Sequence, residues 1–539
     1  MGVSLGTYLG DVKMALAGLE RQGVVRRIWQ KDHSVWKPDP TEITNRLGWL
    51  TVTDLMRQEV PALESFAREV REAGFRHVVL LGMGGSSLGP EVLRATFGGI
   101  SGYPAFTVLD STIPSCVQSV AEVIDPARAL FLVSSKSGTT IETLSFFRYF
   151  QSLVVSAIGR EKAGENFVAI TDPGTPLATL AGETRFRRLF LNPPDIGGRY
   201  SVLSYFGLVP AVLMGINITR LLDRAESMRN QCMSDVAIQE NPGALLGAIT
   251  GTMALLGRDK LTLVTSPAIN SFGLWLEQLI AESTGKEGKG IIPVVDEPLM
   301  EPADYGKDRL FACLRLRNEQ NSAIDRTIKS IESSGQPVIL FELGDIYDLG
   351  AEFFRWEFAT AVAASLLGIN PFNQPNVQAA KLATEQVLQQ FLASGHFPQV
   401  EGTCSSTGLL AQAGEGNYLA ALAYLPQTAK LGGSLANFRR KVLKQYRIAT
   451  TLGYGPRYLH STGQLHKGGP GTGLFFIIAP GSNREDLPIP GQPYTFGTLA
   501  DAQAAGDIQA LNLSGRPVAT MRFDHNDLPG LSRSLGELA

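Results

Sequence analysis

The chain is poor in the features that mark membrane, secreted and nucleic-acid-binding proteins. Charged residues make up 18% of its 539 residues and the net charge is −3, so no broad basic field is present for nucleic acid or an anionic membrane. No stretch is apolar over the length of a membrane span. The N-terminus carries Asp11 and Lys13 where a signal peptide needs an unbroken apolar core. We therefore expect a cytoplasmic protein whose partners are small molecules.

Cysteine is also scarce, and its spacing excludes two kinds of site. The four cysteines lie far apart, at Cys116, Cys232, Cys313 and Cys404, without the CxxC or Cys/His spacing of a zinc site. The same wide spacing argues against a disulfide framework. We expect reduced thiols and no metal.

Apolar residues are abundant, and their arrangement indicates the fold. Hydrophobic residues make up 44% of a chain that is long enough for roughly three or four domains. After a helical segment that reaches about residue 75, short continuous apolar runs alternate with helix-length segments. Such runs are typical of strands buried on both faces, and hence of a doubly wound parallel sheet. The runs of the first series are 77–84, 105–111, 129–135, 167–172 and 188–193.

Two further series of apolar runs predict two more α/β portions. The second series is followed by a long helical pattern at 351–369, and a basic helical segment lies inside the third series. The runs of these two series are 260–267, 290–295, 309–316 and 337–343, then 417–426, 447–454, 473–480 and 516–523. We therefore predict an α/β protein with parts at 1–75, 76–245, 246–391 and 392–539.

The stretch VSSKSGTTIET, at 133–143, joins one of these runs to a helical pattern. In open α/β sheets ligands bind beyond the carboxyl ends of the strands, where loops lead into helices. Several hydroxyls, a lysine and the positive end of a helix suit a phosphate group. A simple Ser/Thr helix cap is the alternative, although one hydroxyl would suffice for a cap.

A second glycine-rich turn, GMGGSSLGP at 82–90, also follows a strand and opens a helix. Gly84 and Gly85 allow a ligand to approach the backbone closely, and Ser86 adds a donor. The spacing is GxGG rather than the GxGxxG of dinucleotide sites, and Asp110 alone keeps a dinucleotide fold as a weaker alternative. Two such loops on neighbouring strands fit a compact phosphorylated ligand better.

Four motifs together resemble those of the glucose-6-phosphate isomerase family. They are 82–90, 134–143, GGRYSVLSYFG at 197–207 and GINPFNQPNVQAAK at 368–381, and they occur in the family's order. The resemblance implies two doubly wound sugar isomerase domains, here with a helical N-terminal segment and a C-terminal α/β extension. The two ends of the chain further resemble the isomerase half of bacterial transaldolase/isomerase fusions, and we expect no transaldolase barrel before it.

The resemblance also implies an activity and a set of site residues. The family interconverts glucose 6-phosphate and fructose 6-phosphate without a metal or nucleotide cofactor, by ring opening and proton transfer through an enediolate. A permanently charged arginine can stabilise the enediolate without competing for the proton. The matching catalytic residues are Arg199, Glu282, Lys381 and His460, and the matching substrate-binding residues are Gly85, Ser86, Ser135, Lys136, Ser137, Thr140 and Gln374.

Two of these roles have rivals. Glu282 matches the family's base, whereas Glu277 lies five residues earlier in the same helical pattern and Glu297 resembles the environment found in longer members. The family's ring-opening histidine follows its glutamate closely, yet no histidine lies between Glu282 and Lys381. His460 in YLHSTGQ is the strongest candidate for that role and His466 the second. In family members this histidine comes from a neighbouring subunit, so we expect a homodimer.

Other function classes stay open from the sequence. A non-catalytic sugar-phosphate sensor could use the same fold and phosphate loop, but it would lack the acid/base set. An isomerase of mannose 6-phosphate or of an aminosugar phosphate could use the same base.

Overall fold

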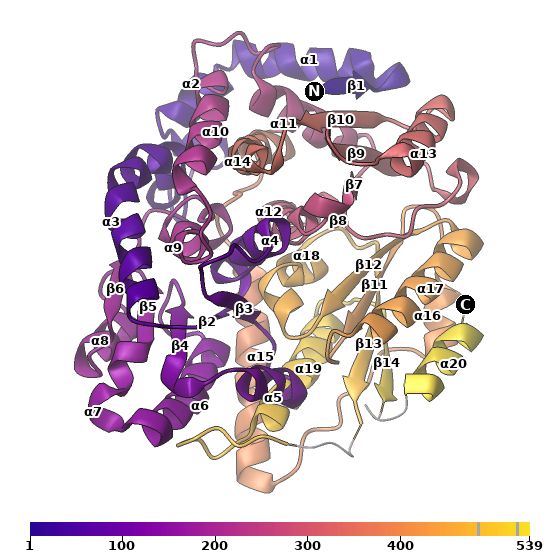
Figure 1. The fold of residues 1–539 in the computed structure, drawn as a ribbon. Helices are drawn as coiled ribbons and strands as arrows, with labels where there is room; N and C mark the ends of the chain where they lie inside the picture. The colour runs from indigo at the N-terminus through magenta and orange to yellow at the C-terminus, as the bar shows by residue number, and fades with distance from the viewer. Residues whose placement is uncertain (482–485, 524–527, 539) are drawn as a thin grey trace.

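A computed structural model describes residues 1–481, 486–523 and 528–538 of the chain. Three β-sheets follow one another along the sequence, each with helices packed around it (Figure 1). In that view the first sheet lies at the lower left, the second at the top and the third at the lower right. The prediction of an α/β protein built on parallel sheets is confirmed.

The first sheet has five parallel strands in the order β3-β2-β4-β5-β6. All residues of β4 and β5 are buried, as expected for apolar runs covered on both faces. The strands are β2 (His77–Gly82), β3 (Ala105–Leu109), β4 (Ala129–Ser134), β5 (Phe167–Thr171) and β6 (Arg188–Leu191). The helices that follow them are α4 (Leu88–Phe97), α5 (Pro114–Val123), α6 (Ile141–Ile158), α7 (Arg160–Ala163) and α8 (Pro176–Glu183).

The second sheet has the order β1-β10-β9-β7-β8, and its four predicted strands are parallel. These strands are β7 (Lys260–Thr265), β8 (Ile292–Val294), β9 (Arg309–Leu316) and β10 (Val338–Leu343). The fifth strand, β1 (Gly2–Ser4), pairs antiparallel with β10. We predicted only helices up to residue 75, because three residues are too few to show the alternation of a strand.

Helices cover the second sheet and join it to the first. The helix α14 packs closely on α10 and α11, and α3 packs on α9. These helices are α1 (Leu9–Arg21), α2 (Val24–Trp29), α3 (Val52–Glu72), α9 (Tyr205–Leu213), α10 (Ile218–Gln231), α11 (Pro242–Leu255), α12 (Phe272–Thr284), α13 (Ser322–Ser333) and α14 (Leu349–Leu367).

The third sheet has four parallel strands in the order β12-β11-β13-β14. They are β11 (Tyr418–Ala423), β12 (Ala449–Tyr454), β13 (Gly473–Pro480) and β14 (Val518–Phe523). Its helices are α15 (Pro375–Ser394), α16 (Ser406–Leu410), α17 (Ala429–Tyr446), α18 (Gly463–Gly468), α19 (Phe496–Leu513) and α20 (Leu528–Leu538). The predicted C-terminal α/β extension is thus a sheet of its own.

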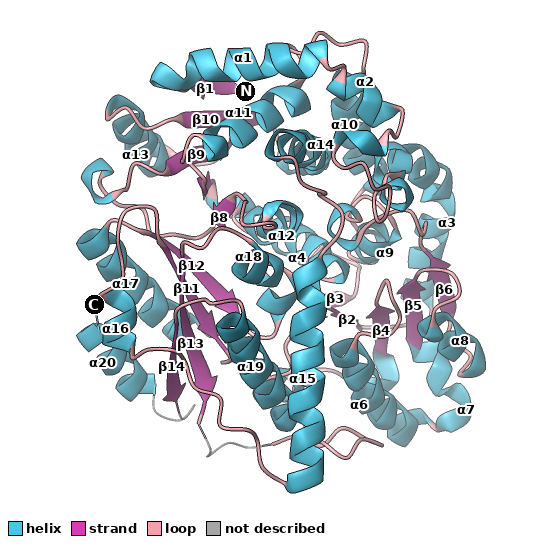
Figure 2. Cartoon of the chain, turned by 180° about the vertical axis from the view of Figure 1, so that it is seen from behind, coloured by secondary structure: helices cyan, strands magenta, loops and turns pink. Residues whose placement is uncertain are grey.

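A long helix lies along the third part, and another helix brings all three parts together. The long helix α15 runs beside α19 of the third part (Figure 2). The helix α12 contacts α4 of the first part, α14 of the second and α18 of the third. The carboxyl end of α12 is therefore a place where side chains from all three parts can meet.

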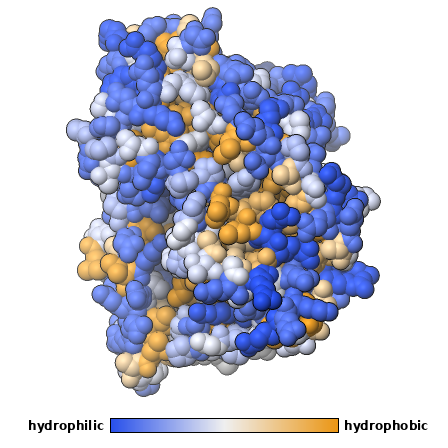
Figure 3. Space-filling view, turned by 90° about the vertical axis from the view of Figure 1, so that its left-hand side faces the viewer, coloured by the Kyte–Doolittle hydropathy of each residue, from blue (hydrophilic) through white to orange (hydrophobic). Residues whose placement is uncertain are grey.

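The surface is mostly hydrophilic on the face shown in Figure 3, with scattered hydrophobic patches between the polar side chains. Within the described ranges of the chain, no helix has the length and apolarity to cross a bilayer.

Candidate active site

The hydroxyl-rich loop lies between β4 and the N-terminus of α6, as the sequence predicts. Its hydroxyls form two pairs: Ser135 Oγ lies 2.8 Å from Thr140 Oγ1, and Ser137 Oγ lies 3.0 Å from Thr139 Oγ1. Thr140 is the N-cap residue of α6, but its side chain makes no capping hydrogen bond. Capping alone therefore does not account for this hydroxyl, and the first N–H groups of an 18-residue helix point toward the loop.

Lys136 in the same loop has a partner that the sequence did not indicate. Its ammonium group contacts the carboxylate of Asp172, directly after β5, and donates to the Pro194 carbonyl oxygen at 3.2 Å. Burial raises the pKa of Asp172 above its ordinary value, although the hydrogen bond from Lys136 and its charge act to lower that pKa. The charge of Lys136 is therefore shared with a protein carboxylate at the edge of the loop.

The glycines of the second turn are required by contacts within the protein. Gly84 has a φ of +54°, and a Cβ atom there would lie 2.7 Å from the His460 carbonyl oxygen. A Cβ atom on Gly85 would lie 2.0 Å from the Gly198 carbonyl oxygen. Only glycine lets this turn approach the segments that carry His460 and Arg199 so closely. Ser86, beside them, is buried.

Arg199 and Glu282 form a buried ion pair at this junction. Arg199 Nη1 lies 3.1 Å from Glu282 Oε1, and the two side chains are 4% and 7% exposed. Arg199 also donates to the Asn373 carbonyl oxygen at 2.9 Å and to Gln374 Oε1 at 3.4 Å. The structure thus brings together three residues that the sequence assigned to the site from three distant motifs.

Gln278 connects this ion pair to His460. Its side-chain amide donates to Glu282 Oε2 at 3.1 Å and to the His460 carbonyl oxygen at 2.9 Å. Among the described residues, Gln278 Oε1, Arg199 Nε and Asn373 Oδ1 are buried without a hydrogen-bond partner. Unpaired polar atoms in the interior are costly unless a water molecule or ligand completes them. The cluster therefore has the character of a binding site.

The rivals of Glu282 have different surroundings. Glu297 accepts two hydrogen bonds from Arg309, at 2.8 and 3.1 Å, and a third from the Thr450 N–H at 2.7 Å. Its carboxylate therefore joins the second and third sheets. Burial raises the pKa of Glu277 to about 8, and the nearby charge of Asp296 adds to this effect.

His460 lies beside Glu142, which belongs to the stretch 133–143 but has no role predicted from the sequence. His460 Nε2 is 2.8 Å from Glu142 Oε1, with the two side chains 18% and 4% exposed. Burial alone would raise the pKa of Glu142, but the charge of His460, the hydrogen bond to it and the charge of Lys381 lower it overall. Its place in the first turn of α6 suggested only a favourable interaction with the helix dipole.

His466 has a structural setting instead. Its ring is buried and packs against the rings of Tyr458 and Phe475, with centroids 5.9 and 5.1 Å away. Burial lowers its pKa well below the ordinary value, and the positive charges of Lys467 and Arg516 act in the same direction. His466 is therefore neutral, and the geometry favours His460 of the two.

A cavity of about 600 Å³ opens in front of this pair. It is lined by Thr139, Thr140, Glu142, Lys381 and His460, among other residues. All of them belong to one chain, so His460 reaches Glu142 without a second subunit. Within the described residues, no group of three or more His, Cys, Asp or Glu side chains is arranged to hold a metal ion.

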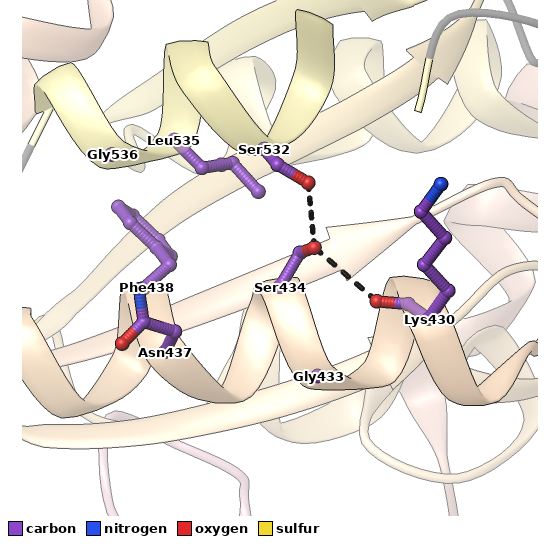
Figure 4. A pocket seen from close by; sticks show the side chains of 8 residues that line it. All are labelled: Lys430, Gly433, Ser434, Asn437, Phe438, Ser532, Leu535 and Gly536. Carbon is purple, nitrogen blue, oxygen red and sulfur yellow. Dashed lines mark hydrogen bonds between the residues drawn. The ribbon is translucent and has the colours of Figure 1, made fainter. Parts of the chain in front are cut away.

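A second hollow, of about 320 Å³, lies between α17 and α20 (Figure 4). Ser434 and Ser532 face each other across it with hydroxyl oxygens 2.7 Å apart. None of the site residues predicted from the sequence lines it.

Comparisons with known proteins point to one family. The sequence profile of the family described as phosphoglucose isomerase matches residues 50–293. The glucose-6-phosphate isomerase of Carboxydothermus hydrogenoformans is 37% identical over 257 residues, which are 44% of this chain and 53% of that protein. The enzyme of the same name from Rubrobacter xylanophilus is 28% identical over 61% of this chain and 86% of its own length. The chain thus spans about half of the first relative and most of the second.

Solved structures show the same fold. A glucose-6-phosphate isomerase from Chlamydia trachomatis superposes with a TM-score of 0.61 at 18% identity, over 72% of this chain and 87% of that one. A hypothetical protein from Thermus thermophilus superposes with a TM-score of 0.60 at 24% identity, over 71% and 99%. Four family motifs gather around one buried junction in this chain, and the profile of the phosphoglucose isomerase family spans three of them, so the chain is similar to members of that family over this part.

Proposed function

We propose that the protein interconverts glucose 6-phosphate and fructose 6-phosphate. The observation that carries this proposal is the connected arrangement of a buried Arg199–Glu282 pair, Gln278 and the His460–Glu142 pair next to a hydroxyl-rich helix start. Such an arrangement offers a carboxylate base, a permanent positive charge and a second acid/base group within one site. The names of the relatives support the same reaction.

The phosphate group would bind where β4 ends and α6 begins. Ser135, Ser137 and Thr140 provide hydroxyl donors there, and the free N–H groups of α6 add the positive end of its dipole. Lys136 contributes positive charge from beside Asp172. In the same proposal, Gly85 and Ser86 contact the sugar from the neighbouring turn.

Proton transfer would follow ring opening. An ionised Glu142 can only accept hydrogen bonds, so the proton between it and His460 belongs to Nε2, and Nδ1 is the ring nitrogen left to exchange a proton with the sugar. Glu282 would then move a proton between C2 and C1 while Arg199 stabilises the negative charge of the enediolate. Lys381 and Gln374 complete the polar wall around the substrate.

A homodimer in the cytoplasm belongs to this proposal, but catalysis does not depend on it. The expectation of a dimer rested on a histidine from a neighbouring subunit, whereas His460 meets Glu142 of its own chain. We therefore propose that each chain carries a complete site, whatever its assembly. The likeness to one half of a transaldolase fusion stays a prediction.

Turnover of purified protein with separate sugar phosphates tests the function. Glucose 6-phosphate should give fructose 6-phosphate, with less activity on mannose 6-phosphate and glucosamine 6-phosphate. Binding of hexose phosphates without any turnover would favour the sugar-phosphate sensor instead. A preference for glucosamine 6-phosphate would identify an aminosugar isomerase.

A further inference from the structure

A line of buried hydrogen bonds continues from the catalytic histidine into the C-terminal part of the chain. Glu142 Oε1 accepts from His460 and also from the side-chain amide of Gln503, whose Nε2 is 2.6 Å away. The other end of that amide, Gln503 Oε1, accepts from the hydroxyl of Thr112 at 2.8 Å. Gln503 is 2% exposed and Thr112 is fully buried.

The direction of these bonds is fixed by chemistry. The Thr112 hydroxyl is the donor to Gln503 Oε1, because an amide oxygen only accepts. The amide nitrogen of Gln503 therefore faces Glu142. In the flipped orientation, the amide oxygen would lie against the Glu142 carboxylate, and neither group could donate a hydrogen bond. Gln503 therefore presents a donor to Glu142 in one defined orientation.

A competing partner for Glu142 lies in the same cavity. Lys381 lines the cavity with Glu142, and its positive charge acts on the carboxylate. A carboxylate held by His460 alone could turn toward the ammonium group and release the imidazole ring. The bond from Gln503 to the same oxygen opposes that movement.

The helix that carries Gln503 also supports the segment that carries His460. One turn further along α19, Asp507 accepts hydrogen bonds from the Tyr458 hydroxyl at 2.6 Å and from Lys467 at 2.5 Å. Tyr458 lies two residues before His460 in the turn Arg457–His460. The helix α19 thus contacts Glu142 through Gln503, and the turn that carries His460 through Asp507.

We infer that Gln503 is a positioning residue for this site: it holds Glu142 at the oxygen to which His460 donates, and so keeps the imidazole aimed at the sugar. This inference rests on the proposed isomerase function. It gives the C-terminal part, through α19, a supporting role in ring opening.

The test replaces Gln503 with methionine, which keeps the length of the side chain but removes both hydrogen bonds. Gln503→Met should lower kcat on cyclic glucose 6-phosphate by about 10-fold or more, with KM changed by less than about 2-fold. Reaction of an open-chain analogue should stay near the wild-type rate. Thr112→Val, which leaves Gln503 in place but unanchored, should shift the same ratio in the same direction. Gln509→Met, on a more exposed position of α19, is the matched control.

A second measurement does not need turnover. In protein with nitrogen-15-labelled histidine, the Nε2 proton of His460, assigned by its loss in His460→Ala, should be visible in the wild type. The same signal should broaden or disappear by solvent exchange in Gln503→Met. Failure of the wild type to convert any hexose phosphate would reject the proposed function. The histidine signal would then still test whether Gln503 positions the His460–Glu142 pair. An unchanged signal in Gln503→Met, or equal losses on cyclic and open-chain substrates, would overturn the inference.

Discussion

Arg199 Nη1 lies 3.1 Å from Glu282 Oε1, in a buried ion pair between residues 83 positions apart in the sequence. An arginine keeps its proton throughout the working pH range, so it can hold the carboxylate in place and still face a developing enediolate. A base and an anion-stabilising group in contact are what an aldose/ketose isomerisation needs.

Glu282→Gln should keep sugar-phosphate binding and lose proton exchange at C2. The amide has nearly the shape of the carboxylate but cannot take a proton, so exchange with deuterated solvent should fall by about 1,000-fold or more. Proton NMR of the substrate measures the exchange, and calorimetry measures binding. If Glu282→Gln exchanged the C2 proton at nearly the wild-type rate while Glu277→Gln or Glu297→Gln lost that exchange, the proton-transfer base would be Glu277 or Glu297.

His460→Ala should slow the cyclic substrate much more than an open-chain analogue. Only the cyclic form needs an acid/base group to open the ring, so kcat should fall by about 100-fold for glucose 6-phosphate and little for the analogue. His396→Ala, at an exposed position beyond α15, serves as the control. Equal losses on both substrates would reject the ring-opening role.

Thr140→Val should weaken binding of phosphorylated sugars specifically. The substitution keeps the branched shape but removes one hydroxyl at the start of α6, and a hydrogen bond to a charged group is commonly equivalent to about 10-fold in affinity. KM for glucose 6-phosphate should therefore rise by about that factor while kcat changes less. Unaltered KM and unaltered affinity for inorganic phosphate would place the phosphate group elsewhere.

Mixing two inactive variants should not restore activity. When Glu282→Gln and His460→Ala are unfolded together and refolded, or co-expressed, every chain lacks one of the two groups. A site completed within one chain stays inactive in such a mixture. A site that takes its histidine from a partner would regain part of the wild-type activity in mixed dimers, and that result would contradict the single-chain site.

Glu357→Gln should stabilise the protein more at higher pH. Glu357 is fully buried in α14, and neither of its carboxylate oxygens has a hydrogen-bond partner among the described residues. Burial raises its pKa well above the ordinary value of 4.5, so the folded protein holds a proton that the unfolded chain releases as the pH rises past that value.

The sign of this effect follows from linkage. The stability associated with Glu357 is fully present below its ordinary pKa and decreases by roughly 1.4 kcal/mol for each pH unit above it, until the raised pKa is reached. The amide does not titrate. The difference in Tm between Glu357→Gln and the wild type, measured by thermal melts in parallel, should therefore grow as the pH rises above about 5. A difference independent of pH would mean that Glu357 is ionised in the folded protein.

The amino-acid sequence by itself determined where the strands of the three sheets lie and where the loops proposed to bind the ligand follow them. Continuous apolar runs such as Leu130–Val133 leave little choice of structure, because residues of that kind must be covered on both faces. Hydroxyls and glycines after such runs similarly indicate the carboxyl edge of a sheet. The strand Gly2–Ser4 carried no such signal, because its pairing with β10 is set by a neighbour more than 300 residues away.

Only the tertiary structure decided which side chains meet. His460 and Glu142 are 318 positions apart, and Lys136 and Asp172 come from different loops, so no local pattern ties either pair together. Whether His460 or His466 faces the cavity depends on how the third part packs against the first. Local residue types fix the backbone conformation through short-range sterics and burial, whereas the distance between two side chains depends on the packing of whole elements. The roles proposed for Glu142 and Gln503 follow from that packing.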